Sequence, residues 1–165
     1  MKEEVCALDL LYLVKEFQDL TESRVDKIFQ KERDFLITTH VVGKGKKFIR
    51  ITPRNIYLTE HKETYPDKIL GFCSFLRKKL SGSVIKNISQ KNFERIITIT
   101  FEKKDLKYFM IIELFSNGNL ILCDNNYKII SALESHKWKD RIVRGGITYE
   151  FPPEQINTVS LTEEE

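Results

Sequence analysis

Five strand-like runs follow one another in the second half of the chain, and their connections are too short to hold a helix. Parallel neighbours need a crossover of about a dozen residues or more, so these runs are expected to pair antiparallel. Asn117-Gly118 and Asp124-Asn125-Asn126 are turn sequences of the hairpin kind. The sequence therefore predicts an antiparallel meander. Its five runs are Val84–Gln90, Phe93–Glu102, Lys107–Phe115, Leu120–Cys123 and Lys128–Leu133.

The first half of the chain also alternates apolar and polar residues with a period of two, which is typical of half-buried strands. A basic Gly-Lys turn at residues 43–47 separates two pairs of runs. Gly145-Gly146 precedes a last short strand that is expected to end at Pro152-Pro153. The four runs of the first half are Val25–Phe29, Asp34–Thr39, Phe48–Ile51 and Ile56–Thr59.

Two segments have helical rather than strand periodicity. The first begins near Asp9, a residue that can cap helix N–H groups, and the second begins after Pro66-Asp67 and stops at Gly82. The predicted fold class is therefore α+β: an antiparallel β-sandwich or half-open barrel with two principal helices packed on it. The two apolar stripes are Ala7, Leu10, Leu11, Val14 and Phe17, and Ile69, Phe72, Cys73, Leu76 and Leu80.

Length and composition limit the class of protein. A chain of 165 residues with a hydrophobic fraction of 41% has room for one domain with a real core. No apolar run approaches the ~20 residues that span a bilayer, and the acidic start does not resemble a secretory signal. Three well-separated cysteines, Cys6, Cys73 and Cys123, are expected to be reduced and to fill the core. A cytoplasmic location without membrane partners follows.

The charge is unevenly distributed. The net charge is +3, but residues 1–4 and 154–165 hold 6 of the 24 acidic residues and one of the 27 basic residues. We interpret both segments as tails, so the body has 26 basic and 18 acidic residues, a net charge of +8. Such a body is compatible with a nucleic-acid partner and equally with an ordinary solvated basic surface.

Familiar catalytic patterns are absent from the sequence. The three histidines lie far apart and lack a second ligand at helical spacing, so no zinc site is predicted. The Gly-Lys turn lacks the spacing of a phosphate-binding loop, and no nucleophile elbow occurs. We therefore expect no enzyme activity, no metal and no cofactor.

Two basic clusters are candidates for contacts with a phosphate backbone. One lies in the Gly-Lys turn and the other in the last turn of the second predicted helix, where positive charge also complements the helix dipole. The candidate residues are Lys44, Lys46, Lys47, Arg77, Lys78 and Lys79.

Four segments occur in an order and spacing that resembles the N-terminal domain of the NFACT proteins, in detail more archaeal or eukaryotic than bacterial. The resemblance extends from Val5 to Pro153, which predicts an NFACT N-terminal domain over residues 1–153 and an acidic tail or linker over 154–165. The segments are Ala7–Leu10, Phe75–Gly82, Gln90–Ile97 and Glu113–Asp124.

The resemblance implies a non-catalytic module of a ribosome-associated quality control factor. Such a factor senses stalled large ribosomal subunits that carry peptidyl-tRNA, recruits aminoacyl-tRNA for C-terminal tailing, and reaches a ubiquitin ligase or other quality-control proteins through other domains. The implied fold is similar to the N-terminal domain of formamidopyrimidine-DNA glycosylases.

Three other functions are compatible with parts of the sequence. The first is a protein-interaction scaffold. The second is a glycosylase-like nucleic-acid-binding domain without activity, since no proline precedes Pro53 to act as the nucleophile. The third is fibronectin adhesion, which some relatives' names suggest and which the lack of a signal peptide or disulfide pattern disfavours.

The family uses an Asp-Arg pair and a first-helix Asp on tRNA, and here these positions are Glu94, Arg95 and Asp9. Two alternatives stay open. If the strand runs regularly from Phe93, the Arg95 side chain faces the core and pairs with Glu113. If instead a bulge forms at residues 92–94, the Arg95 side chain points outward and is available to RNA. Asp9 is equally compatible with a plain helix cap.

Overall fold

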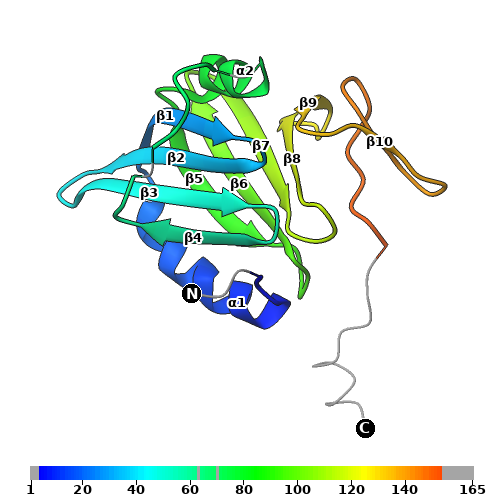
Figure 1. The fold of residues 1–165 in the computed structure, drawn as a ribbon, viewed down its shortest axis with the longest axis horizontal. Helices are drawn as coiled ribbons and strands as arrows, with labels where there is room; N and C mark the ends of the chain where they lie inside the picture. Colours follow the sequence, from blue (N-terminus) through cyan, green and yellow to red (C-terminus); the bar gives the residue numbers. More distant parts are fainter. Residues whose placement is uncertain (1–3, 63, 70, 154–165) are drawn as a thin grey trace, which may run out of the picture.

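The computed structural model describes residues 4–62, 64–69 and 71–153. Its main element is an antiparallel sheet of nine strands in the order β4-β3-β2-β1-β5-β6-β7-β8-β9 (Figure 1). The expected α+β class with two principal helices is confirmed. The strands of the main sheet are β1 Arg24–Lys31, β2 Asp34–Val41, β3 Gly45–Thr52, β4 Asn55–Thr59, β5 Val84–Gln90, β6 Ile96–Lys103, β7 Leu106–Glu113, β8 Asn119–Asp124 and β9 Ile129–Ala132.

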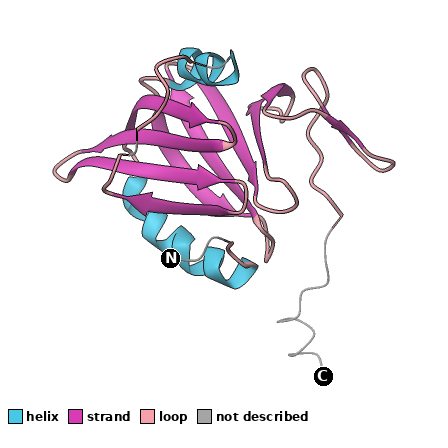
Figure 2. Ribbon diagram, in the orientation of Figure 1, coloured by secondary structure: helices cyan, strands magenta, loops and turns pink. Residues whose placement is uncertain are grey.

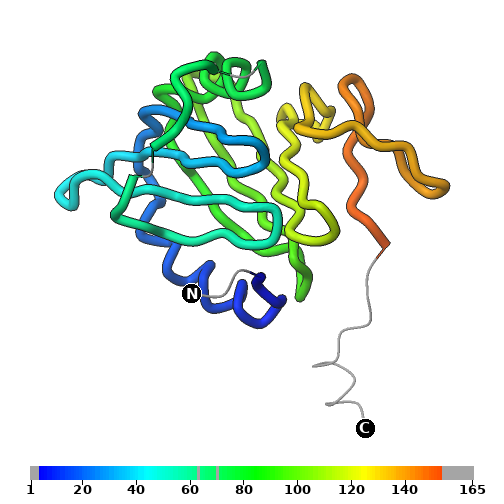
Figure 3. Tube along the Cα trace, in the orientation of Figure 1, coloured from blue at the N-terminus to red at the C-terminus, as the bar shows by residue number. Residues whose placement is uncertain are grey.

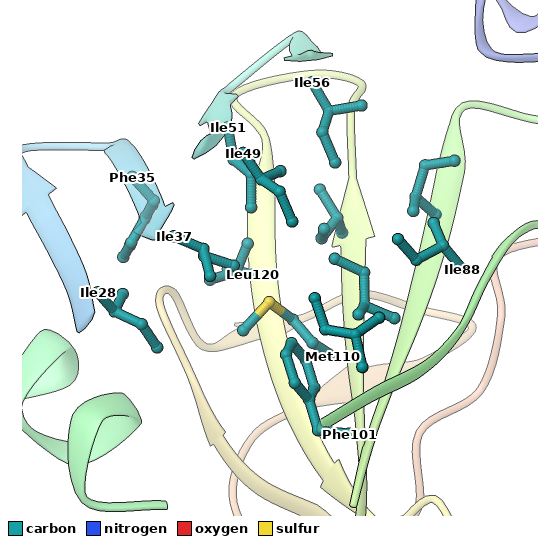
Figure 4. Close-up of a cluster of buried hydrophobic side chains, with 14 of the residues drawn as sticks. Ile28, Phe35, Ile37, Ile49, Ile51, Ile56, Ile88, Phe101, Met110 and Leu120 are labelled. Atoms are coloured by element: carbon teal, nitrogen blue, oxygen red, sulfur yellow. The ribbon is translucent and has the colours of Figure 1, made fainter. Parts of the chain in front are cut away.

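The sheet folds over on itself where β1 meets β5, so that its two halves enclose a core. Only Arg24 and Val84 are paired in register there. Side chains of β1 to β3, including Ile28, Ile37 and Ile49, meet Phe101 of β6 and Met110 of β7 between the halves (Figure 4). The result is one sheet whose two halves enclose a core, within the range of the predicted β-sandwich or half-open barrel.

Two helices close the ends of the sandwich (Figure 2). Helix α1, Ala7–Phe17, continues into a short 3₁₀ turn, η1 Gln18–Leu20, and helix α2 spans Gly71–Leu80. In α1 the buried residues are Leu10 and Phe17, whereas Leu11, expected in the stripe, is 43% exposed. Ile69, also expected in a stripe, lies before α2 begins and is 44% exposed.

A second apolar cluster covers the outer face of β6 to β9. The segment between β9 and residue 153 packs against this face (Figure 3) and contributes Val143 and Tyr149. It contains the small hairpin β10 His136–Lys137 and β11 Ile142–Val143, and in place of the expected last strand a single bridge joins Lys128 to Thr148. Because β7 and β8 are covered on both faces, their sequences are almost continuously apolar.

The burial of the three cysteines agrees only in part with the prediction. Cys73 and Cys123 are buried free thiols, as predicted, but Cys6 is exposed, because it precedes the first turn of α1 rather than pointing into the core. The acidic segment 154–165, expected as a tail or linker, lies outside the described residues. Within the described residues, no helix combines the length and apolar character needed to cross a membrane.

Candidate nucleic-acid interface

The turn between β5 and β6 decides where Arg95 points. The expected strand from Phe93 is wrong, because residues 92–95 form a turn and β6 begins at Ile96. Asn92 adopts a left-handed backbone with φ 48°, which asparagine tolerates better than most residues. The Lys91 amide donates to the Ile96 carbonyl at 2.9 Å and closes the turn. Arg95 therefore precedes the regular strand, and strand parity does not direct its side chain into the core.

The alternative pairing of Arg95 with Glu113 is also wrong. Glu113 is 3% exposed, and its Oε2 lies 2.9 Å from Nη1 of Arg141. The Tyr149 hydroxyl donates to the same oxygen at 2.6 Å. Burial, and then the Glu113 charge, raises the pKa of Tyr149. The partners of this buried carboxylate thus come from the C-terminal segment, not from the turn.

Asp9 caps the first helix. Its Oδ2 accepts the backbone amide of Cys6, the residue before α1, at 3.0 Å. This bond satisfies an N–H group at the helix start, which is the structural role weighed for Asp9. The same bond fixes the carboxylate at the end of α1 that faces the 92–95 turn.

Asp9, Glu94 and Arg95 line one open groove of about 490 Å³, formed by the start of α1 and the turn before β6. The structure therefore brings the three predicted tRNA-contacting residues together from segments some 85 positions apart. The remaining residues of the groove are Glu4, Val5, Cys6, Ala7 and Phe93.

Gln90 holds the two sides of the groove together, and the sequence analysis did not identify it as a site residue. Its Nε2 donates to the carbonyl of Ala7 at 3.0 Å and to the carbonyl of Glu94 at 2.7 Å. The available signal was its place as the last residue of β5, directly before the turn. Its amide fixes the spacing between the helix start and the Glu94-Arg95 pair.

Glu4, which we interpreted as part of a tail, belongs to the wall of the groove. Its Oε1 lies 3.1 Å from Nη1 of Arg95, and its Oε2 lies 3.6 Å from Nη1 of Arg54. The side chain of Arg95 is 32% exposed, so it is accessible from solvent while it is paired.

The first basic cluster lies at the β2–β3 hairpin, with Lys44 in the loop and Lys46 and Lys47 in the first turn-proximal residues of β3, and this loop projects past the ends of the neighbouring strands (Figure 1). Lys44 lies 3.8 Å from Asp19 in an exposed ion pair, and the half-buried Lys47 lies 4.0 Å from the exposed Glu60. Lys46 is exposed. This loop does not line the groove of Arg95.

The second basic cluster lies on α2, at the end of the sandwich opposite α1 (Figure 2). Arg77 donates from Nε to the Ile28 carbonyl at 2.5 Å and lies over the Phe29 ring, so it supports the packing of α2 on β1. Lys78 is exposed, and Lys79 lies over the ring of Phe75. The six candidate phosphate-contacting residues therefore form two clusters, each separate from the groove.

Comparison with known proteins gives a family match and several relatives. The family described as NFACT N-terminal and middle domains matches residues 7–165. The archaeal Rqc2 homolog aRqcH of Methanocaldococcus jannaschii is 32% identical over 98% of this chain and 25% of its own length. Ribosome quality control complex subunit 2 of Saccharomyces cerevisiae is 32% identical over 79% of this chain and 13% of its own length.

A solved structure has the same fold. The N-terminal domain of fibronectin-binding protein PavA from Streptococcus pneumoniae superposes with a TM-score of 0.83 at 25% identity, covering 95% of this chain and 67% of that chain. The chain thus spans about a quarter or less of the length of the two relatives above.

Proposed function

This chain belongs to the NFACT family, and on that premise we propose that it is a non-catalytic tRNA- and ribosome-binding module of a cytoplasmic ribosome quality control factor. The observation that carries the proposal is the meeting of Asp9, Glu94 and Arg95 in one groove. By the resemblance, these are the positions of the family's first-helix Asp and its Asp-Arg pair. The Saccharomyces cerevisiae relative is named as a ribosome quality control complex subunit, and the archaeal relative is named as an Rqc2 homolog, which supports the same process.

The chemistry of the groove suits a structured RNA. An arginine can stack on a base and donate to a phosphate at once, and Arg95 is partly exposed at the groove wall. Carboxylates accept hydrogen bonds from the amino groups of base edges, which is a role for Asp9 and Glu94. Glu94 is one methylene longer than the family's Asp, which keeps the carboxylate chemistry and changes its geometry in the groove. The +8 body adds attraction to phosphates that does not depend on sequence.

In the full-length protein, we propose that this module contacts peptidyl-tRNA or aminoacyl-tRNA on a stalled large ribosomal subunit. Recruitment of aminoacyl-tRNA for C-terminal tailing, and contact with a ubiquitin ligase or other quality-control proteins, would need the other regions of the protein. The two basic clusters are proposed to contact phosphates at a distance from the groove, with Lys44, Lys46 and Lys78 their exposed members.

The test is a comparison of selectivity. Arg95→Ala should weaken binding of cognate tRNA about tenfold and binding of bulk RNA much less, because base-directed contacts carry selectivity. Lys46→Ala should weaken both RNAs equally and slightly. Arg144→Ala is the matched control, since it removes an equal charge from an exposed position on the C-terminal segment. Equal loss of all RNAs on Arg95→Ala would contradict the proposed site.

A protein-interaction scaffold is the second candidate, and one observation favours it. Leu8, Leu11 and Tyr12 lie on the outer side of α1 with exposures of 47%, 43% and 60%. Exposed apolar side chains gathered on one helix are common at protein contacts. The scaffold would be favoured if the domain fails to bind tRNA. It would also have to bind another part of the full-length protein through this helix.

A further inference from the structure

We infer that Arg54 and Arg95 form one phosphate-binding pair, and that the Glu4 carboxylate occupies the phosphate position in the RNA-free domain. The inference rests on the proposed function, since it assigns the phosphate to the backbone of a bound RNA. Arg54 is not among the residues that the family pattern suggests, and it enters the site only through its place in the fold.

The geometry of Glu4 is that of an anion held between two guanidinium groups. One carboxylate oxygen lies 3.1 Å from Nη1 of Arg95, and the other lies 3.6 Å from Nη1 of Arg54. A phosphate presents the same charge sign and the same kind of paired oxygen acceptors, and arginine binds both groups by the same forked hydrogen bonds. The position between the two arginines is therefore suited to a phosphate of the RNA backbone.

Both arginines are positioned by the connection between β7 and β8. The Arg54 Nε donates to the Ser116 carbonyl at 3.1 Å, which orients its guanidinium group. The Leu114 amide donates to the Arg95 carbonyl at 2.9 Å, which fixes the backbone of the turn. Because one connection holds the Arg54 side chain and the Arg95 backbone, the two residues stay adjacent when the Glu4 side chain leaves.

The Glu4 side chain can be displaced without unfolding its segment. The side chains of Glu4 and Arg54 are 52% and 51% exposed, and ion pairs at such exposure are weak. The next residue, Val5, is 3% exposed and donates its amide to the Arg54 carbonyl at 2.9 Å. Val5 thus anchors the chain, while rotation of the Glu4 side chain alone opens the position to RNA.

The experiment measures binding of purified total tRNA to four variants of this domain at low salt. Glu4→Gln removes the competing charge and should tighten binding about fivefold, the effect of one charge at about 4 Å in water. Arg54→Ala should weaken binding about fivefold. In the Arg54→Ala background Glu4→Gln should give a smaller gain than in the wild type, because Glu4 still competes at Arg95 but no longer at Arg54. Glu22→Gln is the matched control, because Glu22 is an exposed glutamate paired with Lys86 at 2.9 Å and lies outside the groove.

The outcomes separate this inference from the proposed function. Equal gains from Glu4→Gln and Glu22→Gln, or a full gain from Glu4→Gln without Arg54, would overturn the Arg54–Arg95 pair while leaving tRNA binding intact. Absence of binding by the wild type and by the Glu4→Gln variant would refute the proposed function, and this inference with it. Binding that appears only in Glu4→Gln would support both. Thermal melting of each variant confirms that it is folded.

Discussion

Glu113 is a buried carboxylate that the fold pairs with an arginine and a tyrosine. Its carboxylate is 3% exposed, and the Arg141 guanidinium and the Tyr149 hydroxyl both contact the same oxygen. The side chain of Arg141 is itself only 7% exposed and also lies 4.6 Å over the Trp138 ring. An ion pair at this depth is stable only while both partners are present. The triad of Glu113, Arg141 and Tyr149 therefore fastens the C-terminal segment to the sheet.

Removal of the Glu113 charge should be strongly destabilising. Glu113→Gln keeps the shape of the side chain but leaves the buried Arg141 cation unpaired, which should lower the free energy of unfolding by about 3–5 kcal/mol. Tyr149→Phe removes one hydrogen bond and should cost about 1–3 kcal/mol. Urea unfolding measures both. A loss for Glu113→Gln no larger than for the exposed Glu4→Gln, at most about 1 kcal/mol, would contradict the role of the triad.

Cys123 makes a prediction about alkaline pH. Burial, and then the neighbouring Asp124 charge, raises the pKa of its thiol from 9.0 to about 12. Between these values the unfolded chain releases the proton and the folded chain keeps it, so stability is full below about pH 9 and falls as pH rises. Between these two pKa values, the Cys123 thiol should lower the free energy of unfolding by about 1.4 kcal/mol for each unit of pH.

The measurement is urea unfolding of wild type and Cys123→Ala from about pH 8 to about pH 11. The variant starts less stable, because it loses buried volume. Its free energy of unfolding should fall less steeply with pH than that of the wild type, because the variant lacks the one thiol that keeps its proton only in the folded state. Parallel pH profiles for the two proteins would contradict burial of this thiol in the folded state.

At the scale of elements, two turns meet where the site is assembled. Gly118, in the connection between β7 and β8, has φ +73°, and a Cβ there would lie 2.5 Å from the Cα and carbonyl oxygen of Pro53. Pro53 immediately precedes Arg54, whose guanidinium bonds to Ser116 in the same connection. The close approach of Gly118 and Pro53 therefore sets the position of Arg54 beside the groove.

Gly118→Ala should lower the melting temperature more than Gly43→Ala. Gly43 has a similar φ of +79° with nothing within 4 Å of an added Cβ, so its substitution costs only backbone strain of about 1 kcal/mol. Gly118→Ala adds a clash with backbone atoms, which we expect to cost about 1–3 kcal/mol more. Melting curves for the two variants test this difference, and equal melting temperatures would refute the close contact.

The sequence was informative for elements that local periodicity specifies and uninformative for contacts between distant segments. Alternation and short connections predict the strands and the antiparallel pairing, because each strand buries one face beside its neighbour. The turn before β6 was predicted too short, because Phe93, Glu94 and Arg95 fit the alternation of the strand that follows. Ile69 was placed in a stripe because periodicity does not reveal where the first turn of a helix begins.

At the scale of the whole molecule, the groove exists because the folded sheet brings α1 beside the start of β6. The family resemblance predicted Asp9, Glu94 and Arg95, which are far apart in sequence, but their spacing on the groove comes from Gln90 and the 92–95 turn. Arg54 and Glu4 could not be predicted, because nothing local distinguishes them from other exposed charges. The pairing of Glu113 with Arg141 likewise depends on the path of the C-terminal segment over the sheet.

The most direct measurement is fluorescence anisotropy of tRNA binding at several salt concentrations, for the wild type and for Glu94→Ala/Arg95→Ala. The account predicts that wild-type affinity falls steadily as salt rises, because bound phosphates release counterions. It also predicts that the folded double variant binds at least about tenfold more weakly at each salt concentration. Absence of wild-type binding at low salt, or equal affinity of the folded double variant, would contradict it.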